Sequence, residues 1–130
     1  MKPQKVTIIA EAGVNHNGSF EKAKQLVDRA VAAGADYVKF QTFKAEKIVS
    51  KLAKKAAYQA KNVIDQDDSQ FSMLKNLEMP DEWHFQLYDY CNENNIGFLS
   101  SPFDQDSVEF LDKIGMDLFK IPSGEITNKP

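Results

Sequence analysis

Four short apolar runs alternate with segments of helical periodicity along this chain. The runs are VTIIAE (6–11), DYVKFQ (36–41), FLSSPF (98–103) and DLFKI (117–121). Each run is five or six residues long and lies between polar or glycine positions, which is typical of β-strands. The pattern therefore predicts four strands.

Three further segments place apolar residues at the i, i+3, i+4 spacing of a helix. The first begins after Ser19, a suitable N-cap, and stops at Gly34. The second begins at Pro80, and the third follows Asp104 and stops at Gly115. The predicted buried faces are Phe20, Ala23, Leu26, Val27, Ala30 and Val31 in the first helix, Trp83, Leu87, Tyr90 and Cys91 in the second, and Val108, Leu111 and Ile114 in the third.

The connection over residues 42–79 is too long for an ordinary loop, whose median length is about 4 to 6 residues. It begins basic, turns acidic around 65–68 and ends in a short apolar helix pattern. We interpret it as a helical excursion over one end of the fold. A solvated, partly helical insertion without chemistry explains the pattern equally well.

The predicted order is β-α-β, then the excursion, then α-β-α-β. Strands separated by helices imply a parallel α/β sheet with right-handed crossovers. An open doubly wound sheet and part of a (β/α)8 barrel both fit this order. No G-x-G-x-x-G follows the first strand, which argues mildly against a dinucleotide site.

Two of the runs share a motif that ends in lysine. GADYVKF (34–40) and GMDLFKI (115–121) both read Gly-x-Asp, two apolar residues, Lys and one apolar residue. A buried unpaired ammonium group is costly, so each lysine needs an anionic partner or an exit to water. The recurrence is a weak internal repeat, as expected of repeated βα units.

Polar side chains gather at the C-terminal ends of the predicted strands and in the loops that follow, where α/β barrels hold their chemistry. Two lysines beside a Ser-Gly loop can bind a phosphate and a carboxylate. Each candidate also has a simpler explanation: Glu11 and Lys39 as a structural ion pair, Lys120 as a lysine that reaches the surface, and Ser123 as part of a turn. A binding site is favoured because four predicted strands all bring polar residues to the same end of the sheet. The candidates are Glu11, Lys39, Gln41, Ser101, Lys120, Ser123 and Glu125.

Composition narrows the class of protein. The 130 residues are 42% hydrophobic and 27% charged, as in a single soluble domain, and the net charge of −3 gives no reason to expect nucleic acid or an anionic membrane. The single cysteine, Cys91, excludes an intrachain disulfide, fits a reducing cytoplasm and suits a core position. We expect His16 in a loop and His84 on a helix surface, and no set of residues has metal-ligand spacing.

Four motifs in order resemble the sialic acid synthase family: AEAGVNHNGS (10–19), VKFQTF (38–43), FLSSPFD (98–104) and FKIPSGE (119–125). That family comprises N-acetylneuraminate, legionaminic and pseudaminic acid synthases and a spore-coat polysaccharide relative. Any one motif alone is weak, but the set, with MPDEWH (79–84), is specific. The resemblance runs from about residue 6 to the end of the chain.

The resemblance implies the N-terminal half of a (β/α)8 TIM barrel and a cytoplasmic transferase of sialic acid biosynthesis. Such an enzyme condenses phosphoenolpyruvate with an N-acetylhexosamine, such as N-acetylmannosamine or its 6-phosphate, and releases phosphate. A divalent metal, Mn²⁺ or Mg²⁺, polarises the sugar aldehyde. The enol methylene carbon attacks the aldehyde, water adds to the resulting cationic centre, and phosphate leaves by C–O cleavage.

The same resemblance assigns roles to single residues. Glu11 and Glu125 would lie near the reacting carbons as catalytic residues that handle protons. The family's metal-binding histidines match no residue here, so no metal ligand is expected in this chain. The residues matched to phosphoenolpyruvate binding are Lys39, Gln41, Ser101, Lys120 and Ser123.

Residues 1–130 would supply about four of the eight strands of such a barrel. The other strands, and a C-terminal antifreeze-like domain that reaches across a homodimer, are expected beyond residue 130. We therefore expect these 130 residues alone to be inactive. The alternatives are a legionaminic, pseudaminic or spore-coat relative with another amino sugar, and, in another class, an inactive fragment that acts as a binding or assembly module.

Overall fold

The computed structural model describes residues 5–49 and 67–127. Its three strands are β1 (Ile9–Gly13), β2 (Tyr37–Thr42) and β3 (Gly97–Pro102). They form one parallel sheet in the order β1-β2-β3, with Tyr37 aligned with both Ile9 and Gly97. The first three strands predicted from the sequence are therefore confirmed.

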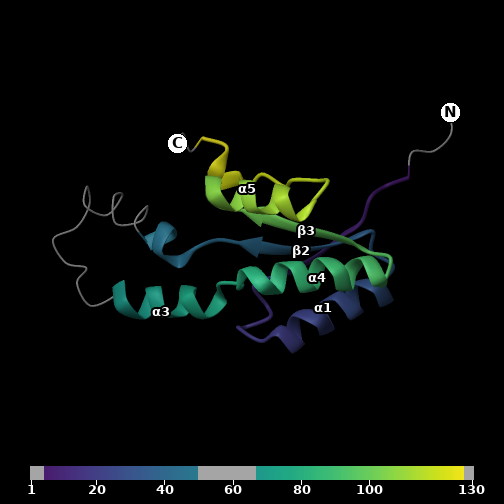
Figure 1. The fold of residues 1–130 in the computed structure, drawn as a ribbon, viewed down its shortest axis with the longest axis horizontal. Helices are drawn as coiled ribbons and strands as arrows, with labels where there is room; N and C mark the ends of the chain where they lie inside the picture. Colours follow the sequence, from purple (N-terminus) through teal and green to yellow (C-terminus); the bar gives the residue numbers. More distant parts are fainter. Residues whose placement is uncertain (1–4, 50–66, 128–130) are drawn as a thin grey trace.

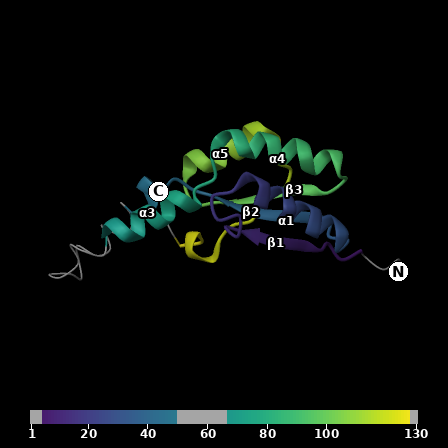
Figure 2. The same ribbon diagram turned by 90° about the horizontal axis from the view of Figure 1, so that it is seen from below.

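Helices cover one face of this sheet. The helices are α1 (Phe20–Ala32), α3 (Asp67–Leu77), α4 (Asp81–Glu93) and α5 (Gln105–Ile114), and residues 45–49 are also helical. Helices α1, α4 and α5 contact the strands (Figure 1). Figure 2 shows α4 and α5 on one side of the sheet and the 3-10 turn η1 (Ser123–Glu125) on the other. None of the helices in the described ranges is both long and apolar enough to cross a bilayer.

The ends of two helices follow the predicted capping residues. Ser19 accepts a hydrogen bond from the backbone N–H of Lys22 at 3.3 Å, and Asp104 accepts one from Ser107 at 2.9 Å. Gly34 and Gly115 end α1 and α5 with φ of +73° and +97°, a left-handed conformation that glycine adopts without a Cβ clash. These local signals are confirmed.

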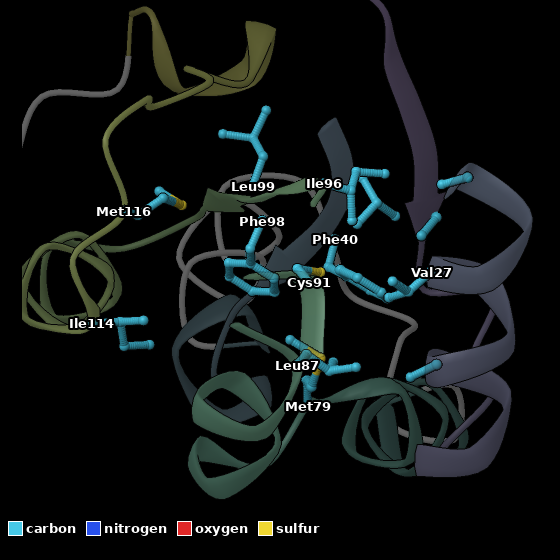
Figure 3. Packing of buried hydrophobic residues seen from close by; sticks show 14 of the residues in the cluster. Val27, Phe40, Met79, Leu87, Cys91, Ile96, Phe98, Leu99, Ile114 and Met116 are labelled. Carbon is cyan, nitrogen blue, oxygen red and sulfur yellow. The ribbon is translucent and has the colours of Figure 1, made fainter. Parts of the chain in front are cut away.

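The core lies between the sheet and the helices (Figure 3). Phe40 and Phe98 point toward the helices and stack with ring centroids 6.0 Å apart, whereas Leu99 points to the opposite side of the sheet. Leu87 and Cys91 of α4 are fully buried, and burial raises the pKa of the Cys91 thiol to about 12. The core position predicted for Cys91 is confirmed.

The motif Gly-x-Asp before β2 extends the pairing of the first two strands. The Asp36 carboxylate accepts a hydrogen bond from the backbone N–H of Ile8 at 2.9 Å and pairs with Lys5 at 2.5 Å. The Ile8 hydrogen bond, with the Lys5 interaction, lowers the pKa of Asp36. Asp36 thus fixes the register just before β1 and β2 begin.

The fourth predicted strand, at residues 117–121, is wrong, because these residues form no strand. Ile121 is 69% exposed, and Leu118 and Phe119 are also exposed. The Met116 sulfur instead accepts the backbone N–H of Ser100 at 3.2 Å, at the edge of β3 that faces away from β2. An edge strand needs both a ladder partner and an apolar covering layer, and the described residues supply no covering layer here.

The structure also tests the predicted burial of Val108 and part of the predicted helical excursion. Val108 is 43% exposed, so its predicted burial is wrong; Ser107 takes the inward position of α5 with Leu111 and Ile114.

The predicted excursion is helical at 45–49 and in α3, while residues 50–66 lie outside the described residues. Lys44, just after β2, pairs with Asp81 of α4 at 2.7 Å and ties the start of the excursion to the fold.

A chain of hydrogen bonds crosses the apolar layer between the sheet and α4. The Thr42 hydroxyl lies 2.6 Å from the Ser100 hydroxyl and 2.8 Å from His84 Nε2. His84 Nδ1 lies 3.0 Å from the carbonyl oxygen of Pro80. A carbonyl oxygen only accepts, so Nδ1 holds the proton, Nε2 accepts from Thr42, and Thr42 accepts from Ser100. We name Ser100, Thr42 and His84 the buried polar chain.

The surface position predicted for His84 is wrong. The residue is 1% exposed, because α4 begins at Asp81 and places His84 on the inward face with Leu87 and Cys91. Burial favours the neutral imidazole and lowers the pKa of His84 to about 4.

This pKa predicts a loss of stability in mild acid. The unfolded chain takes up a proton on His84 near pH 6.5, whereas the folded chain resists it down to about pH 4. The free energy of unfolding should therefore fall by up to about 3 kcal/mol as the pH drops through this window. Urea denaturation of wild type and His84→Gln at several pH values measures the effect. A wild-type curve parallel to that of His84→Gln would contradict it.

A second prediction concerns the close approach of Tyr37 to Gly97. A Cβ added at Gly97 would lie 2.3 Å from the Tyr37 ring, so the ring or the strand would have to move. We expect Gly97→Ala to lower the free energy of unfolding by about 1–3 kcal/mol. Gly124→Ala is the control, because its added Cβ meets no atom within 4 Å. Equal denaturation midpoints for the two variants would refute the clash.

Candidate active site at the strand ends

Four predicted site residues lie on the face of the sheet opposite the helices. Side chains alternate along a strand, so when Phe40 faces the helices, its neighbours Lys39 and Gln41 face the other way. Glu11 is aligned with Lys39, and Gln41 with Ser101, at the C-terminal ends of the strands. We name Glu11, Lys39, Gln41 and Ser101 the strand-end cluster.

The Lys39 ammonium group is the centre of the strand-end cluster. Its Nζ lies 2.5 Å from Glu11 Oε2 and 3.4 Å from Ser101 Oγ. The Lys39 side chain is only 11% exposed, whereas that of Glu11 is 54% exposed. A nearly buried ammonium group thus has its anionic partner on the neighbouring strand, and that partner faces solvent.

Gly13 allows Glu11 and Gln41 to converge. The register shifts between Glu11 and Gly13, as in a β-bulge, and Gly13 has a φ of +54°. A Cβ at this position would lie 3.3 Å from Glu11 Oε1 and 3.8 Å from Gln41 Nε2. Gly13 thus lets the Glu11 carboxylate and the Gln41 amide lie close to the turn after β1, where a larger residue would crowd Glu11.

The other three predicted site residues are not placed by a strand. Lys120 is exposed and makes no hydrogen bond or ion pair with any described residue. Ser123 is exposed and Glu125 half-buried, both in the turn η1. Figures 1 and 2 both place η1 at the end of the molecule toward which the strand arrows point. The structure thus brings four candidates into one cluster and leaves Lys120 outside it.

His16, predicted as a loop residue, lies in the turn after β1 but is fully buried. Its Nδ1 accepts the Gly18 N–H at 3.1 Å, and its ring packs edge-on against Trp83 at 6.0 Å. Burial lowers the pKa of His16. Its Nε2 has no partner among the described residues. The sequence contains no periodic signal in this turn from which the burial could be read.

The described residues do not form a metal centre. No group of three or more His, Cys, Asp or Glu side chains among them converges as ligands would. The buried imidazoles of His16 and His84 are held in separate aromatic contacts, with Trp83 and with Phe110. The residues present therefore do not fit the divalent metal that the resemblance implies.

Residues 26–130 match the model of the NeuB family. This chain belongs to the NeuB family. It is 51% identical over 127 residues to N,N'-diacetyllegionaminic acid synthase of Campylobacter jejuni, covering 98% of this chain and 38% of the relative. It is 43% identical to the spore coat polysaccharide biosynthesis protein SpsE of Bacillus subtilis, covering 99% of this chain and 34% of the relative. The chain thus spans little more than a third of the curated relatives.

Solved structures of NeuB-type proteins share the fold. N-acetylneuraminic acid synthetase from Leptospira borgpetersenii aligns with a TM-score of 0.76 at 25% identity, over 98% of this chain and 42% of that one. The B. subtilis SpsE structure aligns with a TM-score of 0.68 at 41% identity, over 96% and 31%. The predicted fold, parallel βα repeats as in the N-terminal half of the synthase barrel, is confirmed.

The ion pair between Lys39 and Glu11 should contribute measurably to the stability of this NeuB-family chain. Glu11→Gln removes the charge opposite a nearly buried ammonium group, so we expect the free energy of unfolding to fall by about 1–3 kcal/mol. The value lies below that of a fully buried pair because Glu11 is half-exposed. Urea denaturation measures it, with the exposed residue substitution Glu109→Gln as the control. Equal losses in the two variants would show that the pair contributes nothing.

Proposed function

We propose that this chain forms the phosphoenolpyruvate-binding part of a NeuB-family sugar-acid synthase. The synthase joins phosphoenolpyruvate to an N-acetylated amino sugar and releases phosphate. The single observation that supports the proposal most is the Lys39 ammonium group, held nearly buried between Glu11 and Ser101 at the strand ends. Phosphoenolpyruvate is a small, densely charged anion, and a fixed cation with little water around it attracts such an anion more strongly than an exposed lysine does.

The strand-end cluster matches what this ligand requires. Lys39 offers the positive charge, Ser101 a hydroxyl donor and Gln41 an amide donor beside Gly13. In this proposal Lys120 and Ser123 add a second cation and a second hydroxyl. In this proposal the cluster binds the carboxylate and phosphate of phosphoenolpyruvate and orients its enol carbon.

The two glutamates are proposed as the catalytic residues. The enol methylene carbon forms the new C–C bond to the sugar aldehyde, water adds to the cationic carbon that results, and the C–O bond to phosphate breaks. Glu11 is half-exposed beside Lys39, where a carboxylate can accept the proton of the attacking water. Glu125, from η1, would handle protons near the amino sugar. We assign no metal-dependent step to the described residues, because they do not fit a metal ion.

Sequence identity to the relatives supports one class of amino sugar as the second substrate. Two N,N'-diacetyllegionaminic acid synthases are 51% and 52% identical to this chain, whereas the mouse N-acetylneuraminate-9-phosphate synthase is 32% identical. We therefore propose a diacetylated amino sugar as the second substrate in preference to N-acetylmannosamine or its 6-phosphate.

Calorimetric titration with phosphoenolpyruvate tests the proposal. We expect Lys39→Met to weaken binding at least tenfold, because the cation nearest to the anion is lost. Lys113→Met, an exposed helix substitution of the same kind, should leave the affinity unchanged. Glu11→Gln should bind as tightly as wild type or more tightly, since the competing carboxylate is neutralised. Absent binding, or equal affinities for Lys39→Met and Lys113→Met, would refute the proposal and favour a non-catalytic assembly module.

A further inference from the structure

The buried polar chain lies directly behind the strand-end cluster. Thr42 follows Gln41 on β2, Ser100 precedes Ser101 on β3, and Gln41 and Ser101 are register partners. Because side chains alternate, the two hydroxyls of the buried polar chain point toward the helices, while Gln41 and Ser101 point toward the cluster. The hydrogen bond of 2.6 Å between Thr42 and Ser100 therefore links β2 and β3 at the point where both present a site residue.

His84 anchors this link to helix α4. Its ring nitrogens bond Thr42 at 2.8 Å and the Pro80 carbonyl at 3.0 Å, so both are satisfied. Edge-on contacts with Phe110 and Phe98, at centroid distances of 5.0 Å and 6.5 Å, hold the plane of the ring. The imidazole thus has one orientation and one tautomer, and it places the two hydroxyls at set positions.

Stability alone does not account for a polar chain at this place. The neighbouring inward positions are the apolar residues Phe40 and Phe98, and apolar residues at all positions of the layer would bury as much surface without desolvating three polar side chains. Apolar contacts are non-directional, whereas hydrogen bonds set distance and angle. What the buried polar chain adds is therefore a fixed spacing between the C-terminal ends of β2 and β3.

The cluster on the other face is sensitive to that spacing. The contact between Lys39 Nζ and Ser101 Oγ bridges β2 and β3 and, at 3.4 Å, is already near the limit of a hydrogen bond. A further separation of the strands by a few tenths of an ångström would break it. Lys39 would then keep only Glu11, on β1, as its partner.

We propose that His84 is a positioning residue, which acts through Thr42 and Ser100 to hold the anion-binding geometry of Lys39, Gln41 and Ser101. This inference rests on the function proposed above. His84 touches no substrate in this arrangement. Its effect reaches the site only through the hydroxyls behind it.

A matched pair of substitutions at Thr42 tests the inference in the full chain. Thr42→Val keeps the shape of the side chain and removes the hydroxyl, whereas Thr42→Ser keeps the hydroxyl and removes a methyl group. Phosphoenolpyruvate affinity is measured by calorimetry and stability by urea denaturation. We expect Thr42→Val to weaken binding about tenfold and Thr42→Ser to stay within about twofold of wild type, although both lose stability. Ser100→Ala, which removes only the last hydroxyl, should lie between them.

A purely structural role predicts a different result: affinity would follow stability in all three variants, or would not change in any. Either outcome overturns the inference. Amide hydrogen exchange at residues 40–42 and 100–101 supplies a readout that needs no ligand, and it should accelerate in Thr42→Val but not in Thr42→Ser. If wild type does not bind phosphoenolpyruvate, the proposed function fails, and hydrogen exchange alone decides the positioning role. Unchanged exchange in Thr42→Val would then refute that role.

Discussion

The parallel register of β1, β2 and β3 is the constraint on which the other features of this molecule depend. With Glu11 aligned to Lys39 and Gln41 aligned to Ser101, the alternation of side chains divides every strand between two faces. One face packs against α1, α4 and α5, and the other presents charged and polar groups. A shift of one residue would exchange the faces, burying Lys39 against the helices and exposing Phe40. Asp36, which bonds the backbone of Ile8 just before the strands begin, helps to exclude that shift.

Both faces of the sheet are polar near its C-terminal end, for different reasons. On the face opposite the helices, the Lys39 ammonium group is compensated by the half-exposed carboxylate of Glu11. On the helix face, the buried polar chain is fully satisfied and has a single proton arrangement. The charged residues of one face are thus backed by a neutral, fully hydrogen-bonded network on the other, and in our proposal this network fixes the spacing of the strands that carry them.

Much of the fold could be predicted from local patterns. The caps at Ser19 and Asp104 and the glycine stops depend on neighbouring residues, and the apolar runs that became the three strands are also a local signal. The strand at 117–121 failed because a strand exists only with a partner and a cover, which its own sequence does not contain. The polarity of His84 predicts a surface position, whereas its helical spacing from Leu87 and Cys91 indicates the inward face.

By itself, the sequence determined which residues are available for chemistry. It also determined that Glu11, Lys39, Gln41 and Ser101 lie at the C-terminal ends of their strands, since the alternation of side chains along a strand is a local property. Its motifs also determined membership of the NeuB family. Only the tertiary structure decided that Glu11 is the partner of Lys39, that Glu11 and Gln41 come together at Gly13, and that Lys120 stays outside the cluster. The physical reason is that ion pairing and burial depend on distances between segments far apart along the chain, and these distances exist only once the strands have paired and the helices have covered them.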